Sequence, residues 1–73
     1  MNIIIEDADT LKFYTGEGKW TKNAADGKKF TGSTQAFNAA SNEPIGKFNI
    51  AGHIIETNQL INFRQGTGTG AAS

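Results

Sequence analysis

The chain contains no cysteine, and its single histidine is His53. A disulfide, a thiolate zinc site and an all-histidine metal site are therefore excluded within one chain. At 73 residues the chain is one domain, and a domain of this size buries only about 60% of its unfolded surface. Small domains commonly use disulfides or metals as staples. We therefore expect the stability to come from an apolar core or from a partner subunit, and we expect no cofactor.

Short runs of β-branched, aromatic or alternating apolar residues predict strands. The connections between the runs are short, so we expect antiparallel pairing, with the first two runs forming a hairpin. In the second run, Leu11 and Phe13 are expected to share one face. Gly52, in the middle of the fourth run, predicts a bulge, a bend or a close backbone contact. The predicted strands are residues 3–5, 11–15, 19–21, 46–56 and 59–64.

One short helix is predicted between the third and fourth strands. Ser33 is a suitable N-cap, and residues 34–41 favour about two helical turns. Asn42 is expected to close the helix in the left-handed conformation. A helix this short is not stable alone, so it must pack on the sheet. The residues expected on its inner face are Ala36, Phe37 and Ala40.

These elements predict an α+β fold, a small antiparallel sheet with one short helix packed on one face. A small all-β barrel is the alternative, if the helix is only a turn. Residues 1–65 form the predicted domain. Residues 66–73 contain only glycine, threonine, alanine and serine, and we expect them to be a disordered tail.

The charge of the chain is balanced but unevenly placed. Seven basic and seven acidic residues give a net charge of zero, which argues against a general nucleic-acid binder. No apolar run approaches the ~20 residues that span a bilayer. The apolar run 3–5 is followed at once by acidic residues, unlike a signal peptide. We therefore expect a cytoplasmic location.

The sequence lacks the parts of a catalytic or metal site. His53 has no nucleophile context nearby, so we interpret it as an ordinary strand residue. Glu6, Asp7 and Asp9 lack the glycine and distal glutamate of a calcium loop, and we expect a solvated turn there. We therefore expect no metal site and no enzymatic activity.

The segment from residue 12 to residue 30 interleaves lysines with aromatic residues. Single-stranded nucleic-acid binders combine basic grooves with stacking aromatic rings. The favoured interpretation is structural: the rings fill the core and the lysines keep the sheet edges soluble. The candidate partner contacts are Lys12, Tyr14, Lys19, Trp20, Lys28 and Lys29.

The order of Gly18-Lys19-Trp20-Thr21, Lys28-Lys29-Phe30 and the alanine-bearing segment 36–40 is also informative. It resembles small uncharacterised proteins of bacteria and their phages in which a strand ending in Trp-Thr, a phenylalanine step and a short helix recur. The resemblance covers roughly residues 11–41 and implies a structural unit. It carries over no catalytic residue and no ligand.

Two function classes remain. The first is a non-catalytic protein-interaction module, such as an adaptor or inhibitor, that uses an exposed strand edge to bind a protein partner or a second copy of itself. The second is a single-stranded nucleic-acid-binding module that uses the segment 12–30. The sequence favours the first class, because the net charge is zero.

Overall fold

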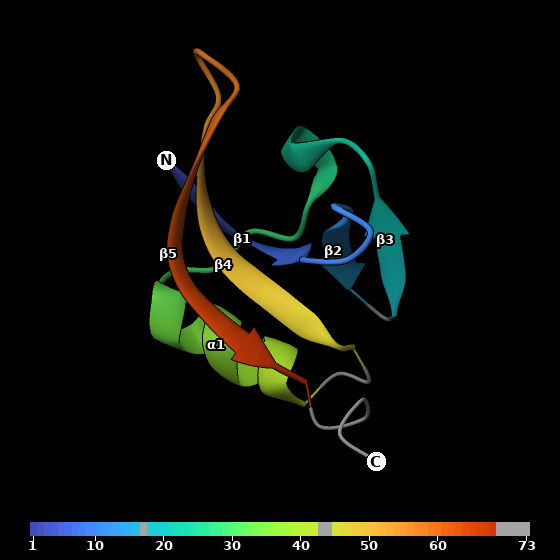
Figure 1. Ribbon diagram of the computed structural model, residues 1–73. Coiled ribbons are helices and arrows are strands. Elements are labelled where there is room, and N and C mark those ends of the chain that lie inside the picture. The colour runs from blue at the N-terminus through green and yellow to red at the C-terminus, as the bar shows by residue number, and fades with distance from the viewer. Residues whose placement is uncertain (17, 43–44, 69–73) are drawn as a thin grey trace.

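The computed structural model describes residues 1–16, 18–42 and 45–68, and it shows an α+β domain (Figure 1). A five-stranded antiparallel sheet has the order β3-β2-β1-β4-β5, and one short helix packs against it. The predicted fold class is thus confirmed. The elements are β1 (Asn2–Asp7), β2 (Phe13–Gly16), β3 (Lys19–Thr21), the 3-10 turn η1 (Ala24–Asp26), α1 (Ser33–Ser41), β4 (Lys47–Ile54) and β5 (Gln59–Thr67).

β1 is the central strand, because it pairs with β2 on one side and with β4 on the other. Ile4 and Ile5 are both fully buried, although neighbouring residues of a strand point to opposite faces. Both faces of the sheet are therefore covered. This explains why the run Ile3–Ile5 is continuously apolar rather than alternating with polar residues.

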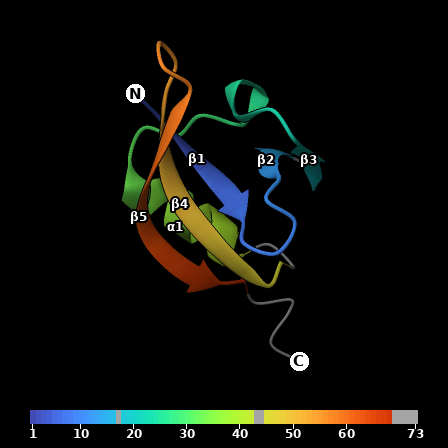
Figure 2. The same ribbon diagram turned by 45° about the horizontal axis from the view of Figure 1, so that its top comes forward.

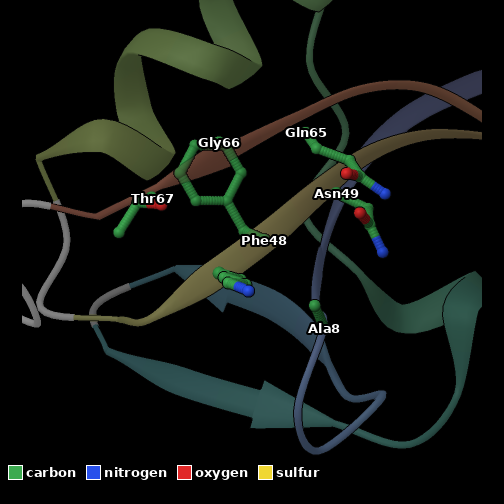
Figure 3. Close-up of a pocket in the computed structure, with 7 residues that line it drawn as sticks. Ala8, Phe48, Asn49, Gln65, Gly66 and Thr67 are labelled. Atoms are coloured by element: carbon green, nitrogen blue, oxygen red, sulfur yellow. The ribbon is translucent and has the colours of Figure 1, made fainter.

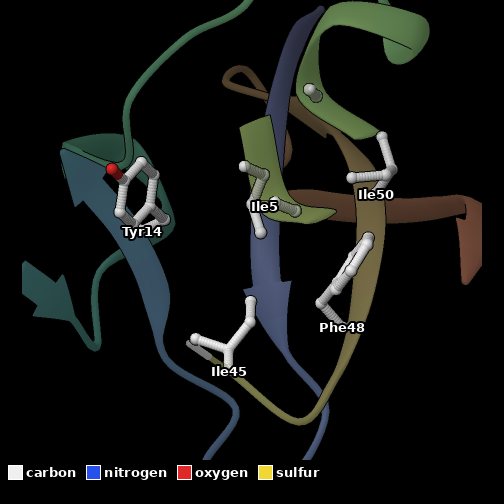
Figure 4. Packing of buried hydrophobic residues seen from close by; sticks show 7 residues of the cluster. Ile5, Tyr14, Ile45, Phe48 and Ile50 are labelled. Carbon is white, nitrogen blue, oxygen red and sulfur yellow. The ribbon is translucent and has the colours of Figure 1, made fainter. Parts of the chain in front are cut away.

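The larger cluster lies between the sheet and α1 (Figure 4). Small side chains on the inner face of the helix, Ala36 and Ala40, let it approach β1 and β4 closely. Phe37 packs against the same cluster, as the sequence predicts. We call this set the helix-side cluster; its buried members are Ile5, Tyr14, Ala36, Ala40, Ile45, Phe48 and Ile50.

The ends of α1 differ from the prediction. Gly32, not Ser33, is the N-cap, and its backbone is extended, with φ −162°. The predicted left-handed conformation at Asn42 is wrong, because this residue has φ −91° and ψ −3°. Its backbone N–H instead reaches back to the carbonyl groups of Ala39 and Ala40, so the helix ends in a right-handed turn.

The opposite face of the sheet is covered by η1. Asn23 caps this turn, since its side-chain oxygen accepts a hydrogen bond of 3.1 Å from the N–H of Ala25. The turn places Ala24 on the sheet. The second cluster consists of Ile4, Phe13, Ala24 and Ala51.

The connection from β1 to β2 is a tight turn. The Asp7 side chain accepts hydrogen bonds from the N–H groups of Asp9 and Thr10. Leu11 has φ +61° and is 62% exposed, so β2 begins only at Phe13. The prediction that Leu11 shares a strand face with Phe13 is therefore wrong. Glu6 was expected in the solvated turn, but it lies buried within β1.

The β4–β5 hairpin is the longest pairing of the sheet, and its tip stands beyond the other strands (Figures 1 and 2). β5 continues to Thr67, and the N–H of Gly68 donates to the carbonyl of Gly46 at 3.0 Å. The predicted tail is therefore wrong for residues 66–68. The rest of that tail, residues 69–73, lies outside the described residues.

Side chains pack closely over Gly52, where the sequence predicts a bulge, a bend or a close backbone contact. A Cβ atom at this position would overlap Met1 Sδ and would lie 2.8 Å from Phe63 Cε2. The bulge of the hairpin lies beside it, between Ile50 and Ala51.

None of the described helices is long and apolar enough to cross a bilayer.

Candidate functional site

Four of the candidate contact residues gather where β2 and β3 meet. Tyr14 pairs with Trp20, and their rings meet edge to face with centroids 5.5 Å apart. Lys19 pairs with Gly16 at one end of the two strands. The backbone N–H of Lys28 donates to the Tyr14 carbonyl at 2.7 Å. We call Tyr14, Lys19, Trp20 and Lys28 the β2–β3 corner.

The other two candidates lie apart from this corner. Lys12 precedes β2, at the opposite end of that strand from Gly16. Lys29 Nζ donates to the carbonyl of Ala25 at 3.2 Å, which ties this side chain to η1. Lys28 Nζ lies 5.6 Å from the centre of the Phe30 ring. Lys28 and Lys29 therefore make separate local contacts, and Lys12 lies at the far end of β2 from Lys19.

The aromatic rings of the β2–β3 corner belong mainly to the core. Tyr14 is only 6% exposed, and Trp20 is half-buried against the helix-side cluster. Single-strand binders stack bases on exposed aromatic faces. The corner offers part of one ring, so its geometry favours the structural interpretation of these residues.

This geometry predicts the result of a titration with a single-stranded oligonucleotide. We expect the fluorescence of Trp20 to stay unchanged at low salt, because its ring is already packed against Tyr14. Trp20 is the only tryptophan, so the signal comes from this corner alone. Quenching that salt reverses, and that disappears in a Lys19→Ala, Lys28→Ala double variant, would contradict the expectation.

A pocket of about 300 Å³ lies at the end of the β4–β5 hairpin opposite its tip (Figure 3). The amide side chains of Asn49 and Gln65 lie side by side there, in register across the two strands. The described lining provides amides, a hydroxyl and one lysine, so it offers hydrogen bonds but no acid–base pair. It consists of Ala8, Lys47, Phe48, Asn49, Gln65, Gly66 and Thr67.

Two polar pairs, one buried and one partly buried, lie on the sheet face that η1 covers in part. Asn49 Nδ2 donates to Glu6 Oε1 at 3.2 Å, which gives the buried carboxyl group of β1 a partner. His53 is 1% exposed, and its Nε2 lies 2.8 Å from Asn58 Oδ1. This hydrogen bond links the imidazole of β4 to the turn between β4 and β5. Its burial supports the interpretation of His53 as a structural strand residue.

Among the described residues, no group of three histidine, cysteine or acidic side chains is close enough to hold a metal ion. The three acidic residues near the first turn are separated by the fold. Glu6 is buried with Asn49, whereas Asp7 organises the turn through its hydrogen bond to the Asp9 N–H. Glu6 therefore takes part in pairing between strands, and Asp7 takes part in the turn.

The outer edge of β5 is the most distinctive exposed surface. β5 is the last strand of the sheet, so its edge facing away from β4 has no partner among the described strands. Three large apolar side chains of this strand, Leu60, Ile61 and Phe63, are each exposed by more than 40%. We call this backbone edge with these side chains the β5 edge.

The sequence predicts the strand but not its place in the sheet. β5 is an edge because β1 lies between β2 and β4, so strand neighbours in space are not all neighbours in sequence. The composition of β5 gives no signal of an edge, because the strand contains no lysine, acid or proline. Those are the residues that natural sheets use to guard an edge.

Comparisons of this chain with protein-family models, with curated proteins and with solved structures find no match. The resemblance of residues 11–41 to small bacterial and phage proteins therefore stays a prediction. The arguments on function below depend on the geometry of the chain itself.

Proposed function

We propose that this protein is a non-catalytic protein-interaction module that binds an extended polypeptide segment along the β5 edge. The observation that carries the proposal is an edge strand of nine residues without lysine, acid or proline, all but one of them exposed. An added strand would satisfy the outward N–H and C=O groups of β5 with main-chain hydrogen bonds.

The side chains of β5 support this mode of binding. Leu60 opposes His53 across the hairpin, whereas Ile61 opposes Gly52, so the two apolar side chains lie on opposite faces. A bound strand would therefore meet an apolar contact on each face. Such alternating contacts provide specificity, while the backbone provides affinity.

The non-catalytic part of the proposal is supported by the placement of the polar groups. The single histidine is buried against Asn58, out of reach of a substrate. The described lining of the pocket beside Gln65 offers only neutral hydrogen-bonding groups and Lys47. These groups suit binding rather than proton transfer.

Selection from a displayed library of extended peptides tests the proposal. We expect selected peptides to alternate apolar and polar residues, and to bind with main-chain pairing to β5. Ile61→Lys should weaken their binding at least about tenfold, or roughly 1.4 kcal/mol, because it removes an apolar contact and adds the cost of desolvating a charge. Fluorescence anisotropy of a labelled selected peptide measures the change.

Leu11→Lys is the matched control, because Leu11 is also an exposed aliphatic residue but lies in the β1–β2 turn. It should leave peptide binding unchanged. Recovery of no binding peptide, or of peptides equally weakened by Leu11→Lys and Ile61→Lys, would remove the β5 edge as the binding surface.

A further inference from the structure

The proposed function leaves open which polypeptide pairs with the β5 edge. We propose that it is a second copy of this chain, so that two β5 strands pair antiparallel across a two-fold axis. The two sheets would then form one continuous sheet. This inference rests on the proposed function, because it names the partner of the same edge.

The bulge of the hairpin decides where such pairing is regular. The register between β4 and β5 shifts between Ile50 and Ala51, and Phe63 is the extra residue in β5. A bulge bends its strand and interrupts regular pairing. The regular part nearest the hairpin tip is therefore residues 59–62, and it contains Ile61.

A two-fold axis at Ile61 gives a self-complementary arrangement. Ile61 then faces its own counterpart, and Leu60 of each copy opposes Asn62 of the other. Gln59 of each copy then reaches the bulge at Phe63 of the other, where regular pairing ends. The only side chains that meet are apolar groups and neutral amides, so the same surface serves both copies, as an isologous interface requires.

Charge supports a second copy. Residues 59–63 carry no charge, and the chain has a net charge of zero, so two copies do not repel each other. The one charged residue of β5 is Arg64. Its guanidinium group stacks on the Phe37 ring, with the guanidinium carbon 3.8 Å from the ring centre. It is therefore held over α1, on the sheet's own helix side.

The apolar surface beside the axis also favours association. Met1 and Phe63 both lie over Gly52, and Ile61 pairs with that glycine. Met1, Ile61 and Phe63 are 44 to 67% exposed. Adjacent exposed apolar side chains of this size are typical of interaction surfaces. Pairing at Ile61 brings two such sets to one interface.

The size of the edge sets the strength of the dimer. A stable interface buries roughly 800 Å² per partner, whereas residues 59–63 extend for only about 17 Å at 3.4 Å per residue. We therefore expect a weak, reversible dimer rather than a permanent one.

Sedimentation and single-cysteine crosslinking test the inference together. The apparent mass of the unmodified protein should rise toward twice that of the monomer as its concentration rises from micromolar to millimolar. Because the chain has no cysteine, Ile61→Cys adds one thiol that faces its counterpart only if the axis passes there. Under mild oxidation it should crosslink at least about tenfold faster than Leu11→Cys.

The outcomes separate the two proposals. A monomer at every concentration, or equal crosslinking of Ile61→Cys and Leu11→Cys, overturns the second copy as partner. If displayed peptides then still bind in an Ile61-dependent way, the interaction module stands and only its partner changes. If neither association nor peptide binding occurs, both proposals fail.

Discussion

Phe48→Ala is expected to unfold much of the protein. Phe48 is fully buried in β4, at the centre of the helix-side cluster, and its ring meets Phe37 edge to face at 5.4 Å. Removing a buried phenylalanine costs about 3–5 kcal/mol, since transfer free energy and packing are both lost. A chain of this length has only roughly 4–11 kcal/mol of stability. The variant should therefore lose a large part of it.

Urea denaturation followed by Trp20 fluorescence measures this loss, because Trp20 packs against the same cluster. Phe63→Ala is the matched control: the same side chain is removed from the neighbouring strand, where it is 46% exposed. We expect a cost of about 1 kcal/mol or less there, as its ring loses less burial. Equal costs for the two variants would contradict the difference in burial between Phe48 and Phe63.

The elements that the sequence predicts well are those whose signal is local. The run Ile3–Ile5 marks β1, and the spacing of Ala36 and Ala40 marks the inner face of α1. In both cases side chains that are close in sequence share one buried environment. Periodicity alone is then sufficient to find the element.

The errors occur where a distant partner decides the structure. Glu6 reads as part of an acidic turn, but Asn49, 43 residues away in sequence, gives its carboxyl group a buried partner. The segment from Gly66 onward has the composition of a tail. Pairing of Gly66 with Phe48 nevertheless holds it in β5. Tertiary contacts override local preference in both places.

The same reason limits prediction of the candidate site. The lysines and aromatic residues of the segment 12–30 suggest a binding site because they are close in sequence. In the structure, however, Tyr14 is buried and the Lys29 side chain is hydrogen-bonded to the Ala25 carbonyl. The β5 edge depends on the order of all five strands. A pattern within 59–67 predicts a strand, but it contains no information on which strands lie beside it.

Gly66→Ala is the second change with a large expected effect. A Cβ atom there would lie 2.6 Å from Phe48 Cζ and 2.7 Å from Phe37 Cε2, closer than real contacts allow. The two rings already pack on each other, and Arg64 covers Phe37, so neither ring moves away freely. We expect a loss of about 1–3 kcal/mol, the usual cost of overpacking. Urea denaturation measures it.

Gly32→Ala is the matched control, because a Cβ atom at Gly32 meets nothing within 4 Å. Its φ of −162° suits any residue, so only the weaker N-cap preference of alanine opposes the change. We expect a change of less than about 1 kcal/mol.

A second test is the double variant Gly66→Ala, Phe37→Leu. If the clash with the Phe37 ring causes the loss, Gly66→Ala should cost less in the Phe37→Leu background than in the unmodified protein. The difference between the two costs is a favourable coupling energy. Strictly additive losses would instead assign the effect to the contact with Phe48 or to the backbone of β5.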